Sequence, residues 1–517
     1  MSITSAVRTV DHLVIGAGFA GLCAAIKLDQ AGEKDFVVVE RGSDVGGTWR
    51  DNTYPGAACD VPSQLYSFSF APNPDWSMSF SPQPEIQRYI QRTAQASGTL
   101  DRFRFETTVD DATWDADQQR WIVRTSPVAG GDPTTYAART LISGAGGLSE
   151  PKLPEIEGIG SFGGELFHSA RWNHDVDLTG KRVAIIGTGA SSIQIVPAIQ
   201  PKVAHLDVYQ RTAPWVMPRH DRTYSSLEKA ALRHVPGLQK VYREAIYWGR
   251  ESYVLPFTRM PAILAPVQRV ALGNIHKGIA DPELRAKVTP DFTMGCKRIL
   301  ISNTYYPALA ADNCDVVTDG ITRVTPTGIV TTDGAGHEVE REVDVLIVAT
   351  GFHTTELPIT EHITGREGHT LAQQFDETGM SAYKGTTVPG FPNLFLIVGP
   401  NTGLGHSSMV FMIESQVSYV VDAVRTMRAH DYGTVEVTER AERAFHADVQ
   451  ARMRPTVWST GGCASWYLDK HGHNTTLWPR STFAFRALTR SFDVAAYTVT
   501  APVPTTSTTP DRKVVNA

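Results

Sequence analysis

Two segments of the chain share one pattern of apolar and polar positions. In each, a short apolar run predicts a buried strand, a glycine-rich turn follows, and an amphipathic stretch leads to a second apolar run that ends in a polar residue. The first segment spans 12–40 with its turn at 16–21, and the second spans 183–211 with its turn at 187–192. This order is typical of the βαβ unit of a dinucleotide-binding fold.

The rest of the chain supplies further elements around these two units. Alternating apolar residues over 103–126 predict a small β-meander, and a strand is expected at 140–143. From about 224 to 291 the apolar spacing is closer to 3.6 than to 2, which predicts a helical insertion. Strands at 343–348 and 394–398 then return late. The predicted fold class is α/β, with two nested Rossmann-like dinucleotide-binding domains and a helical insertion.

Composition and charge exclude several classes of protein. The 517 residues carry a formal net charge of −6, which disfavours a nucleic-acid binder, and 42% hydrophobic residues suit a globular chain. No stretch approaches the ~20 apolar residues of a membrane span. The first apolar run is too short for a signal peptide. We therefore expect a cytoplasmic protein with no nucleic-acid partner and no membrane span, and no pattern specifies an oligomeric state.

The cysteines predict neither a disulfide framework nor a metal site. Five cysteines are scattered without a C-x-x-C pair, so a cysteine zinc site is not expected. The lack of a C-x-x-x-x-C pair also counts against a redox-active disulfide flavoprotein. Cys59 and Cys296 fall inside motifs described below, but the sequence shows no partner for either, and we expect no catalytic role for them.

The first glycine turn has the setting of a nucleotide site. Gly16, Gly18 and Gly21 would let backbone N–H groups approach a pyrophosphate at the start of a helix. Glu40 follows Gly21 by 19 residues, the spacing at which a carboxylate accepts hydrogen bonds from a ribose hydroxyl. The alternative for Glu40 is an exposed carboxylate at the end of a strand.

The second turn keeps Gly187 and Gly189 but has Ser192 at the third glycine position. Arg211 follows Ser192 by 19 residues, where Glu40 stands in the first unit. A guanidinium there would pair with a 2′-phosphate, which predicts NADP as the second nucleotide, and Thr212 would add a hydroxyl donor. The alternative for Arg211 is a solvated surface side chain.

Two longer motifs identify a family by resemblance. The segment 46–60, GGTWRDNTYPGAACD, resembles the GGxWxxxx(F/Y)PGxxxD signature of Baeyer-Villiger monooxygenases. The segment 162–172, FGGELFHSARW, resembles their second fingerprint, except that Asn173 stands where the family has Pro or Asp. The resemblance extends from about residue 10 to about residue 490.

This resemblance implies an enzyme that holds FAD and NADPH and reacts with O2. In the family, a flavin C4a-peroxide attacks a ketone and the adduct rearranges to an ester or lactone. The resemblance implies that Arg298 is the catalytic arginine, that Asp60 pairs with it, and that Lys297 contacts the 2′-phosphate. A fixed guanidinium suits a developing anion. The alternatives are a nucleotide-phosphate contact for Arg298 and a turn cap for Asp60.

The resemblance also implies a division of the chain. The FAD-binding domain would comprise 1–145 and 385–500, and the NADP-binding domain 146–384. Independently of the resemblance, the Thr- and Pro-rich composition of 501–517 predicts a disordered tail. His168 would be a hinge residue between domains. The further cofactor-binding positions, of which Trp49 has core packing as its alternative, are Ala20, Thr48, Trp49, Asp51, Tyr66, Val109, Thr188, Ser191 and Gln194.

Two late segments are candidates for the substrate site. Residues 401–409 follow a strand and could approach the flavin ring, and the aromatic-rich segment 463–478 could form a wall for an apolar ketone or simply be core. Two other functions stay open at this point. One is a flavin monooxygenase that oxidises nitrogen or sulfur, and the other is a redox sensor that binds both nucleotides without turnover.

Overall fold

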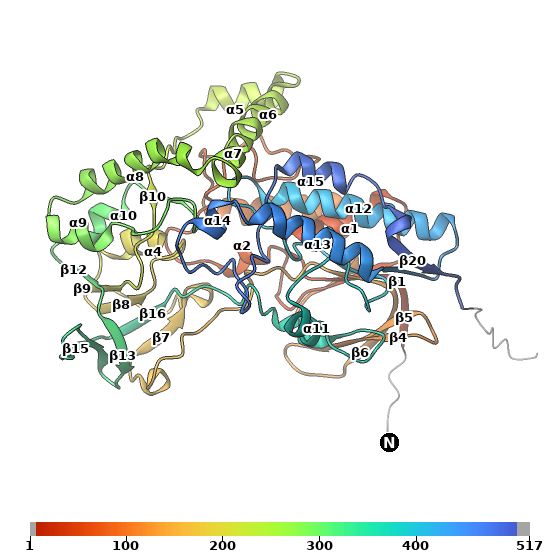
Figure 1. Cartoon of the computed structure of the whole chain (residues 1–517), viewed down its shortest axis with the longest axis horizontal. Helices are drawn as coiled ribbons and strands as arrows, with labels where there is room; N and C mark the ends of the chain where they lie inside the picture. Colours follow the sequence, from red (N-terminus) through yellow and green to blue (C-terminus); the bar gives the residue numbers. More distant parts are fainter. Residues whose placement is uncertain (1–6, 504–517) are drawn as a thin grey trace, which may run out of the picture.

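The computed structural model describes residues 7–503, and Figure 1 shows two lobes, each built around its own sheet. The first sheet takes its strands from 8–143 and 363–396, and the second from 165–209 and 314–348. We call the surroundings of these sheets the first lobe and the second lobe. Residues 1–6 and most of the predicted tail, 504–517, lie outside the described residues.

The first sheet combines a parallel core with an antiparallel meander. β1 pairs in parallel with β2 and β6, whereas β4, β5 and β6 are antiparallel neighbours. On the side away from β1, residues 134–138 of β6 pair with β5 and residues 141–143 pair with β18. The strands are β17 (Ile363–Thr364), β4 (Thr107–Asp115), β5 (Arg120–Pro127), β6 (Thr134–Ser143), β1 (Arg8–Ile15), β2 (Phe36–Val39), β3 (Phe103–Arg104) and β18 (Leu394–Leu396).

The central strands are apolar throughout because both faces of the sheet are covered. Val14 and Val38 face a core formed with three helices, whereas Leu13 and Val37 face the meander. The chain leaves this sheet after β6 and rejoins it at β17, before the predicted boundary at residue 385. The covering helices are α1 (Phe19–Gln30), α3 (Gln83–Ser97) and α12 (Met409–Ala429), with α11 (Leu371–Thr378) against the other core.

The second sheet is entirely parallel. β8 lies between β9 and β16, and β16 pairs in turn with β7. The strands are β12 (Cys314–Val317), β9 (His205–Tyr209), β8 (Arg182–Ile186), β16 (Val345–Val348) and β7 (Glu165–His168). One face packs on α4 (Ser192–Ile199) and α10 (Tyr305–Leu309), and the other on a small sheet of β13 (Gly320–Val324), β14 (Gly328–Thr332) and β15 (Glu338–Glu342).

Helices occupy the stretch between β10 and β11, as the 3.6-residue spacing predicts. In Figure 1 the first three of these helices rise above the junction of the two lobes, and the last two extend over the second lobe. Ser225 caps the first of them in a capping box with Glu228. The elements are β10 (Val216–Met217), α5 (Ser226–His234), α6 (Leu238–Glu251), α7 (Val254–Thr258), α8 (Leu264–Gly278), α9 (Pro282–Val288) and β11 (Leu300–Ile301).

The remaining elements complete the first lobe. They are α2 (Thr48–Asp51), α13 (Glu439–Met453), α14 (Val457–Thr460), α15 (Thr482–Leu488), and the pair β19 (Thr434–Val437) and β20 (Tyr497–Thr500). Within 7–503, no helix combines the length and the apolar character that crossing a membrane requires. The strand order agrees with the predicted nested α/β fold.

We expect Gly21→Ala to destabilise the protein by about 1–3 kcal/mol or more. A Cβ at Gly21 would lie 1.8 Å from the Gly16 carbonyl oxygen, and this neighbour is backbone that cannot turn aside. Gly273→Ala is the matched control, because Gly273 lies in α8 with no atom within 4 Å of the point where a Cβ would stand. It should stabilise by roughly 0.5–1 kcal/mol. Denaturant unfolding measures both, and wild-type stability of Gly21→Ala would contradict the argument.

Candidate active site between two nucleotide cradles

The first glycine turn joins β1 to α1. Gly16 has a φ of +89° and donates its N–H to the Val39 carbonyl at 2.8 Å. Gly21 packs directly against the Gly16 carbonyl, so the first turn of α1 is in close contact with the end of β1. The first N–H groups of a helix have no partner inside the helix. The turn therefore offers donors for a pyrophosphate, as the sequence predicts.

Glu40 lies at the end of β2, beside this turn. Its carboxylate accepts hydrogen bonds from the N–H groups of Ala17 and Gly42, both at 2.7 Å, and from Arg50 Nη1 at 2.8 Å. The side chain is buried, so the alternative of an exposed carboxylate is wrong. These contacts hold the carboxylate at the position expected to meet a ribose.

The signature segment forms a second wall of this cradle. Gly47 has a φ of +52°, and a Cβ there would lie 3.1 Å from the Gly18 Cα, so the two glycine segments approach each other closely. α2 begins immediately afterwards, and Trp49 donates its indole N–H to the Tyr66 hydroxyl at 3.1 Å. A cradle that any side chain would fill fits the backbone-lined site that a flavin nucleotide needs.

The other positions predicted to contact the flavin nucleotide lie around this cradle, with different partners. Ala20 is buried in the first turn of α1. Asp51 accepts two hydrogen bonds from Arg50, at 2.8 and 3.1 Å. Val109 is half-buried on β4, which begins where the Thr107 N–H donates to the Glu40 carbonyl. Thr48 is the first residue of α2.

A bidentate ion pair joins the two lobes at the site. Arg298 donates from Nε and Nη2 to the two carboxylate oxygens of Asp60, each at 2.7 Å. Asp60 closes the signature segment of the first lobe, and Arg298 precedes β11 in the second lobe. The structure thus brings together the two residues predicted as the catalytic pair, and Asp60 does more than cap a turn. Two parallel N–H···O bonds fix the plane of the guanidinium.

The electrostatics keep both members of the pair charged. Burial raises the pKa of the Asp60 carboxyl, but the charge of Arg298 and its hydrogen bonds outweigh burial, so this pKa lies below its usual range. The Asp60 charge raises the pKa of Arg298 further. Burial raises the pKa of the neighbouring Cys59 thiol and Tyr66 hydroxyl, which stay protonated. Asp60 and Arg298 therefore stay oppositely charged, whereas the neighbouring Cys59 and Tyr66 are uncharged.

The second glycine turn joins β8 to α4. Gly187 has a φ of +112°, and a Cβ there would lie 2.5 Å from the Ala349 carbonyl oxygen. Gly189 has open space where a side chain would stand. Thr188 donates its hydroxyl to the Thr212 carbonyl at 3.0 Å, which ties the turn to the segment after β9. The Ser192 hydroxyl is buried, and no described residue hydrogen-bonds to it.

Two cations lie together beyond this turn. Arg211 is exposed and has neither a hydrogen bond nor an ion pair with any residue in 7–503. Burial and then the charge of Arg211 lower the pKa of Lys297. Two positive charges that repel each other fit a doubly charged anion such as a 2′-phosphate. This arrangement agrees with the predicted positions of the NADP phosphate contacts.

Gln194 lies at the interface of the lobes. Its Oε1 accepts from the Tyr54 hydroxyl at 3.0 Å, and its Nε2 donates to the Ala58 carbonyl at 3.0 Å. Gly56 packs so tightly on this residue that a Cβ would lie 2.5 Å from the Gln194 carbonyl oxygen. Ser191 precedes α4 next to these contacts. The signature segment is thus docked on the second lobe close to Asp60.

His168 and Asn173 lie in the segment that follows β7. The His168 Nδ1 accepts the Ala170 N–H at 3.0 Å, and the ring packs edge-on against Phe352 with centroids 5.7 Å apart. Burial lowers the pKa of His168 to about 4, so the ring is neutral near pH 7. Asn173 accepts the Asp175 N–H at 3.1 Å, a turn contact that an aspartate makes in the same way.

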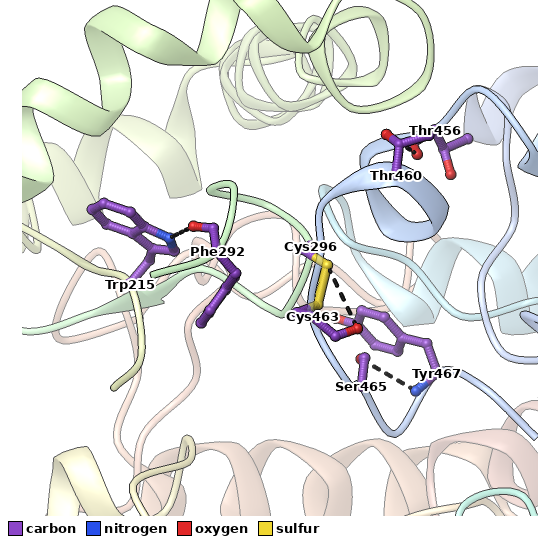
Figure 2. Close-up of a disulfide and its surroundings, with 8 residues drawn as sticks. All are labelled: Trp215, Phe292, Cys296, Thr456, Thr460, Cys463, Ser465 and Tyr467. Carbon is purple, nitrogen blue, oxygen red and sulfur yellow. Dashed lines mark hydrogen bonds between the residues drawn. A yellow bond between two sulfur atoms is a disulfide. The ribbon is translucent and has the colours of Figure 1, made fainter. Parts of the chain in front are cut away.

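The expectation of unpaired cysteines is wrong for two of the five. Cys296 and Cys463 form a disulfide, and Figure 2 shows it below α14, beside Tyr467. The two residues are 167 positions apart, so no local sequence motif indicates that they pair. Sequence reasoning missed it because tertiary packing alone brings the two segments together. The other three cysteines are free and buried.

The two late segments proposed as site walls lie against each other. Asn401 donates its side-chain N–H groups to the carbonyls of Asn474 and Leu477, at 2.8 and 3.0 Å. Tyr467 is buried, and Trp466, its neighbour, is 46% exposed. Burial raises the pKa of Tyr467 to about 12, and the nearby Arg298 charge opposes this shift. The segment 463–478 therefore reaches the ion pair.

Residues of the helical insertion also face the site, and no motif in the sequence points to them. The Arg250 Nε is buried, and no described residue hydrogen-bonds to it. The Arg250 charge contributes to the low pKa of Asp60. Glu251 accepts from Thr482 Oγ1 at 2.7 Å and contacts the His406 Nε2 at 3.2 Å, which anchors α6 to the first lobe.

Comparison with known proteins provides independent evidence for the family of this chain. The model of the flavin-binding monooxygenase-like family matches residues 10–230. The chain is 50% identical to a "Baeyer-Villiger monooxygenase" of Streptomyces coelicolor, over 95% of this chain and 93% of that protein. It is 49% identical to one of Pseudomonas aeruginosa, over 96% and 92% of the respective chains. A solved structure of OTEMO in complex with FAD and NADP superposes with a TM-score of 0.84 at 28% identity, covering 95% and 99%.

We expect His168 to make the stability of the fold sensitive to mild acid. Its pKa is about 4 in the folded chain and about 6.5 in an unfolded one, so the unfolded state binds more protons between these values. Wild type should lose about 3 kcal/mol more than His168→Asn as the pH falls from 6.5 to 4. The asparagine oxygen can replace Nδ1 as an acceptor. Denaturant unfolding at several pH values measures the free energy of unfolding, and His369→Asn, at an exposed histidine, is the control. If this free energy fell equally with pH in wild type and His168→Asn, the prediction would be refuted.

Proposed function

The chain belongs to the Baeyer-Villiger monooxygenases, and from this premise we propose how its residues divide the reaction between them. It is an FAD-containing, NADPH-dependent enzyme that uses O2 to convert ketones to esters or lactones. FAD, reduced by NADPH, supplies the activated oxygen atom that enters next to the ketone carbonyl, and the second oxygen atom leaves as water. The residues described above bind, position and stabilise the groups that react.

FAD binds along the first glycine turn in our assignment. The glycines at 16, 18 and 21 face its pyrophosphate, and Glu40 accepts from its ribose. The close approach of Gly47 to Gly18 supports this assignment, because it forms a cradle of backbone atoms. Thr48, Trp49, Asp51 and Tyr66 continue the cradle toward the ion pair, and Ala20 and Val109 border its two ends.

NADPH binds along the second turn. Gly187, Thr188 and Gly189 face its pyrophosphate together with Ser191 and the unpartnered hydroxyl of Ser192. Arg211, Thr212 and Lys297 hold the 2′-phosphate, which explains why two cations lie close enough to repel each other. Gln194 keeps this cradle docked on the signature segment. The domain division at residues 145 and 385 is part of the same proposal, with β17 as an early return to the first sheet.

The Asp60–Arg298 pair carries the chemistry, and its geometry is the observation on which the proposal depends. Oxygen insertion places negative charge on the ketone oxygen, and a guanidinium stabilises this charge without ever losing its proton. Asp60 binds two of the guanidinium donors and leaves the others for the reacting oxygen. The carboxylate also holds the cation in the site before substrate arrives.

The ketone lies against the ion pair in our assignment, with residues 463–478 as its wall. The half-exposed Trp466, which packs on the buried Tyr467, supplies an apolar surface with little conformational freedom. An apolar ketone therefore suits this wall. We also propose a cytoplasmic location, since Cys23, Cys59 and Cys314 remain free thiols.

Replacing Arg298 by alanine should separate the two halves of the reaction. NADPH should still reduce the flavin anaerobically within a few-fold of the wild-type rate, whereas ester formation should fall at least about 100-fold. Mass analysis of the products identifies an ester one oxygen atom heavier than its ketone. Arg323→Ala is the matched control, because it removes a bidentate Arg–Glu pair on the small outer sheet. Ester formation by Arg298→Ala near the wild-type rate would remove the assignment.

Replacing Arg211 by alanine should raise the KM for NADPH by about 10- to 100-fold and leave the KM for NADH nearly unchanged, since NADH has no 2′-phosphate. Steady-state assays with both cofactors measure the two values. Lys202→Ala is the control, because it removes an exposed cation of the same lobe outside the cradle. An equal rise for both cofactors would show that Arg211 does not recognise the phosphate.

A further inference from the structure

The disulfide connects the two segments that border the ion pair. Cys296 lies two residues before Arg298, and Cys463 lies four residues before Tyr467. Figure 2 shows the sulfur bridge between a loop of the second lobe and the loop that follows α14. The bond therefore ties the arginine segment to the wall segment at a single point.

The two segments remain neighbours whether or not the bond is present. The Thr293 N–H donates to the Gly461 carbonyl at 3.0 Å, and the Cys296 N–H donates to the Thr293 carbonyl at 3.1 Å. A Cβ at Gly461 would lie 2.6 Å from the Cys296 Cβ. These contacts keep the two thiols within bonding reach, so the bond can open and close without rearranging the lobes.

Cys463 differs from the three free cysteines in its access, although its partner Cys296 is buried as they are. Cys463 is half-buried between exposed neighbours, which gives a small reagent a route to its sulfur. Lys297 and Arg298 follow Cys296 directly, and positive charge favours the reactive thiolate. By contrast, Cys23, Cys59 and Cys314 are buried, and burial raises the pKa of each thiol, to about 12 for Cys314.

Apart from Tyr467, which packs in a buried cluster with Phe257 and Trp458, few contacts hold the first part of the wall segment. Thr354 Oγ1 reaches the Trp466 carbonyl only at 3.5 Å, and Lys470 forms an exposed ion pair with Asp376. Firm anchoring resumes at Asn474, which accepts from Asn401. The disulfide is thus the covalent tether of residues 463–473, and it acts beside the packing of Tyr467.

We propose that Cys296 and Cys463 are a reversible thiol–disulfide site that controls the wall of the ketone site. Closing the site forms one S–S bond and releases two protons and two electrons, which hydrogen peroxide takes up to become two water molecules. Opening it transfers two electrons and two protons from a dithiol, which becomes a disulfide itself. The closed form restricts movement of the wall and so slows the passage of ketone and product.

The effect on turnover rests on the proposed position of the ketone, whereas the thiol chemistry does not. Holoenzyme is therefore divided, treated with dithiothreitol or with hydrogen peroxide, freed of reagent and alkylated after denaturation. Mass spectrometry should find all five cysteines alkylated after reduction, and only Cys23, Cys59 and Cys314 after oxidation. An identical alkylation pattern in the two samples would overturn the proposal, and so would a loss of alkylation at Cys23, Cys59 or Cys314 after oxidation.

Turnover and loop access are then measured on the same two samples. The reduced enzyme should convert ketone with a kcat at least threefold higher, while anaerobic flavin reduction by NADPH stays the same. Trypsin should cut after the exposed Lys470 faster in the reduced form. Equal kcat and equal cleavage would overturn the proposal. Absence of ester in both samples would instead refute the proposed function, because the alkylation pattern reports on the thiols separately.

Variants complete the test. Cys463→Ser should always have the higher kcat of the reduced enzyme, and its kcat should not respond to peroxide. Cys296→Ser should behave in the same way. Cys314→Ser is the matched control, because it removes a free buried thiol and should respond as wild type does. Cys463 is the less buried partner, so its variant is the one to rely on if Cys296→Ser folds poorly. A peroxide response retained in Cys463→Ser would refute the assignment.

Discussion

The site depends on one charge pair that neither lobe can form alone. A half-buried guanidinium without a carboxylate would be costly, and so would a carboxylate without its guanidinium. Because Asp60 comes from the first lobe and Arg298 from the second, the pair exists only while the lobes are docked. Gln194 and Tyr54 maintain this docking with hydrogen bonds close by. The nested sheets can be understood as the frame that presents two opposite charges to one space.

Much of this frame can be predicted from local pattern. The two glycine turns predict strand, turn and helix, and at Gly21 and Gly187 a side chain would clash with backbone atoms. The charge that ends each unit also follows from the sequence, and the structure shows Glu40 buried and Arg211 free of any carboxylate in the described chain. The 3.6-residue spacing likewise predicts the helices of the insertion. Each of these patterns is local in sequence, although Gly187 packs against Ala349, which lies far along the chain.

Contacts made across the chain could not be predicted in this way. Cys296 and Cys463 meet only after three separate segments have packed, and Arg250 reaches the site from a helix whose sequence has no motif. The link from Glu251 to His406 and Thr482 joins positions far apart in sequence. Such pairings depend on where whole elements settle, and the residue types alone are compatible with ordinary core or surface positions.

The long strand β6 has a consequence for how the protein is made. Its first half can pair with β5 once this part of the chain has left the ribosome, but its second half has no partner on the same side until β18 at 394–396 is available. The ribosome must therefore deliver the whole second lobe while one edge of the first sheet is still open. An open apolar edge recruits other strands readily. Because β18 follows the second lobe along the chain, the first sheet is incomplete during part of synthesis. A chaperone, or rapid completion of the chain, protects the nascent enzyme from aggregation during that time.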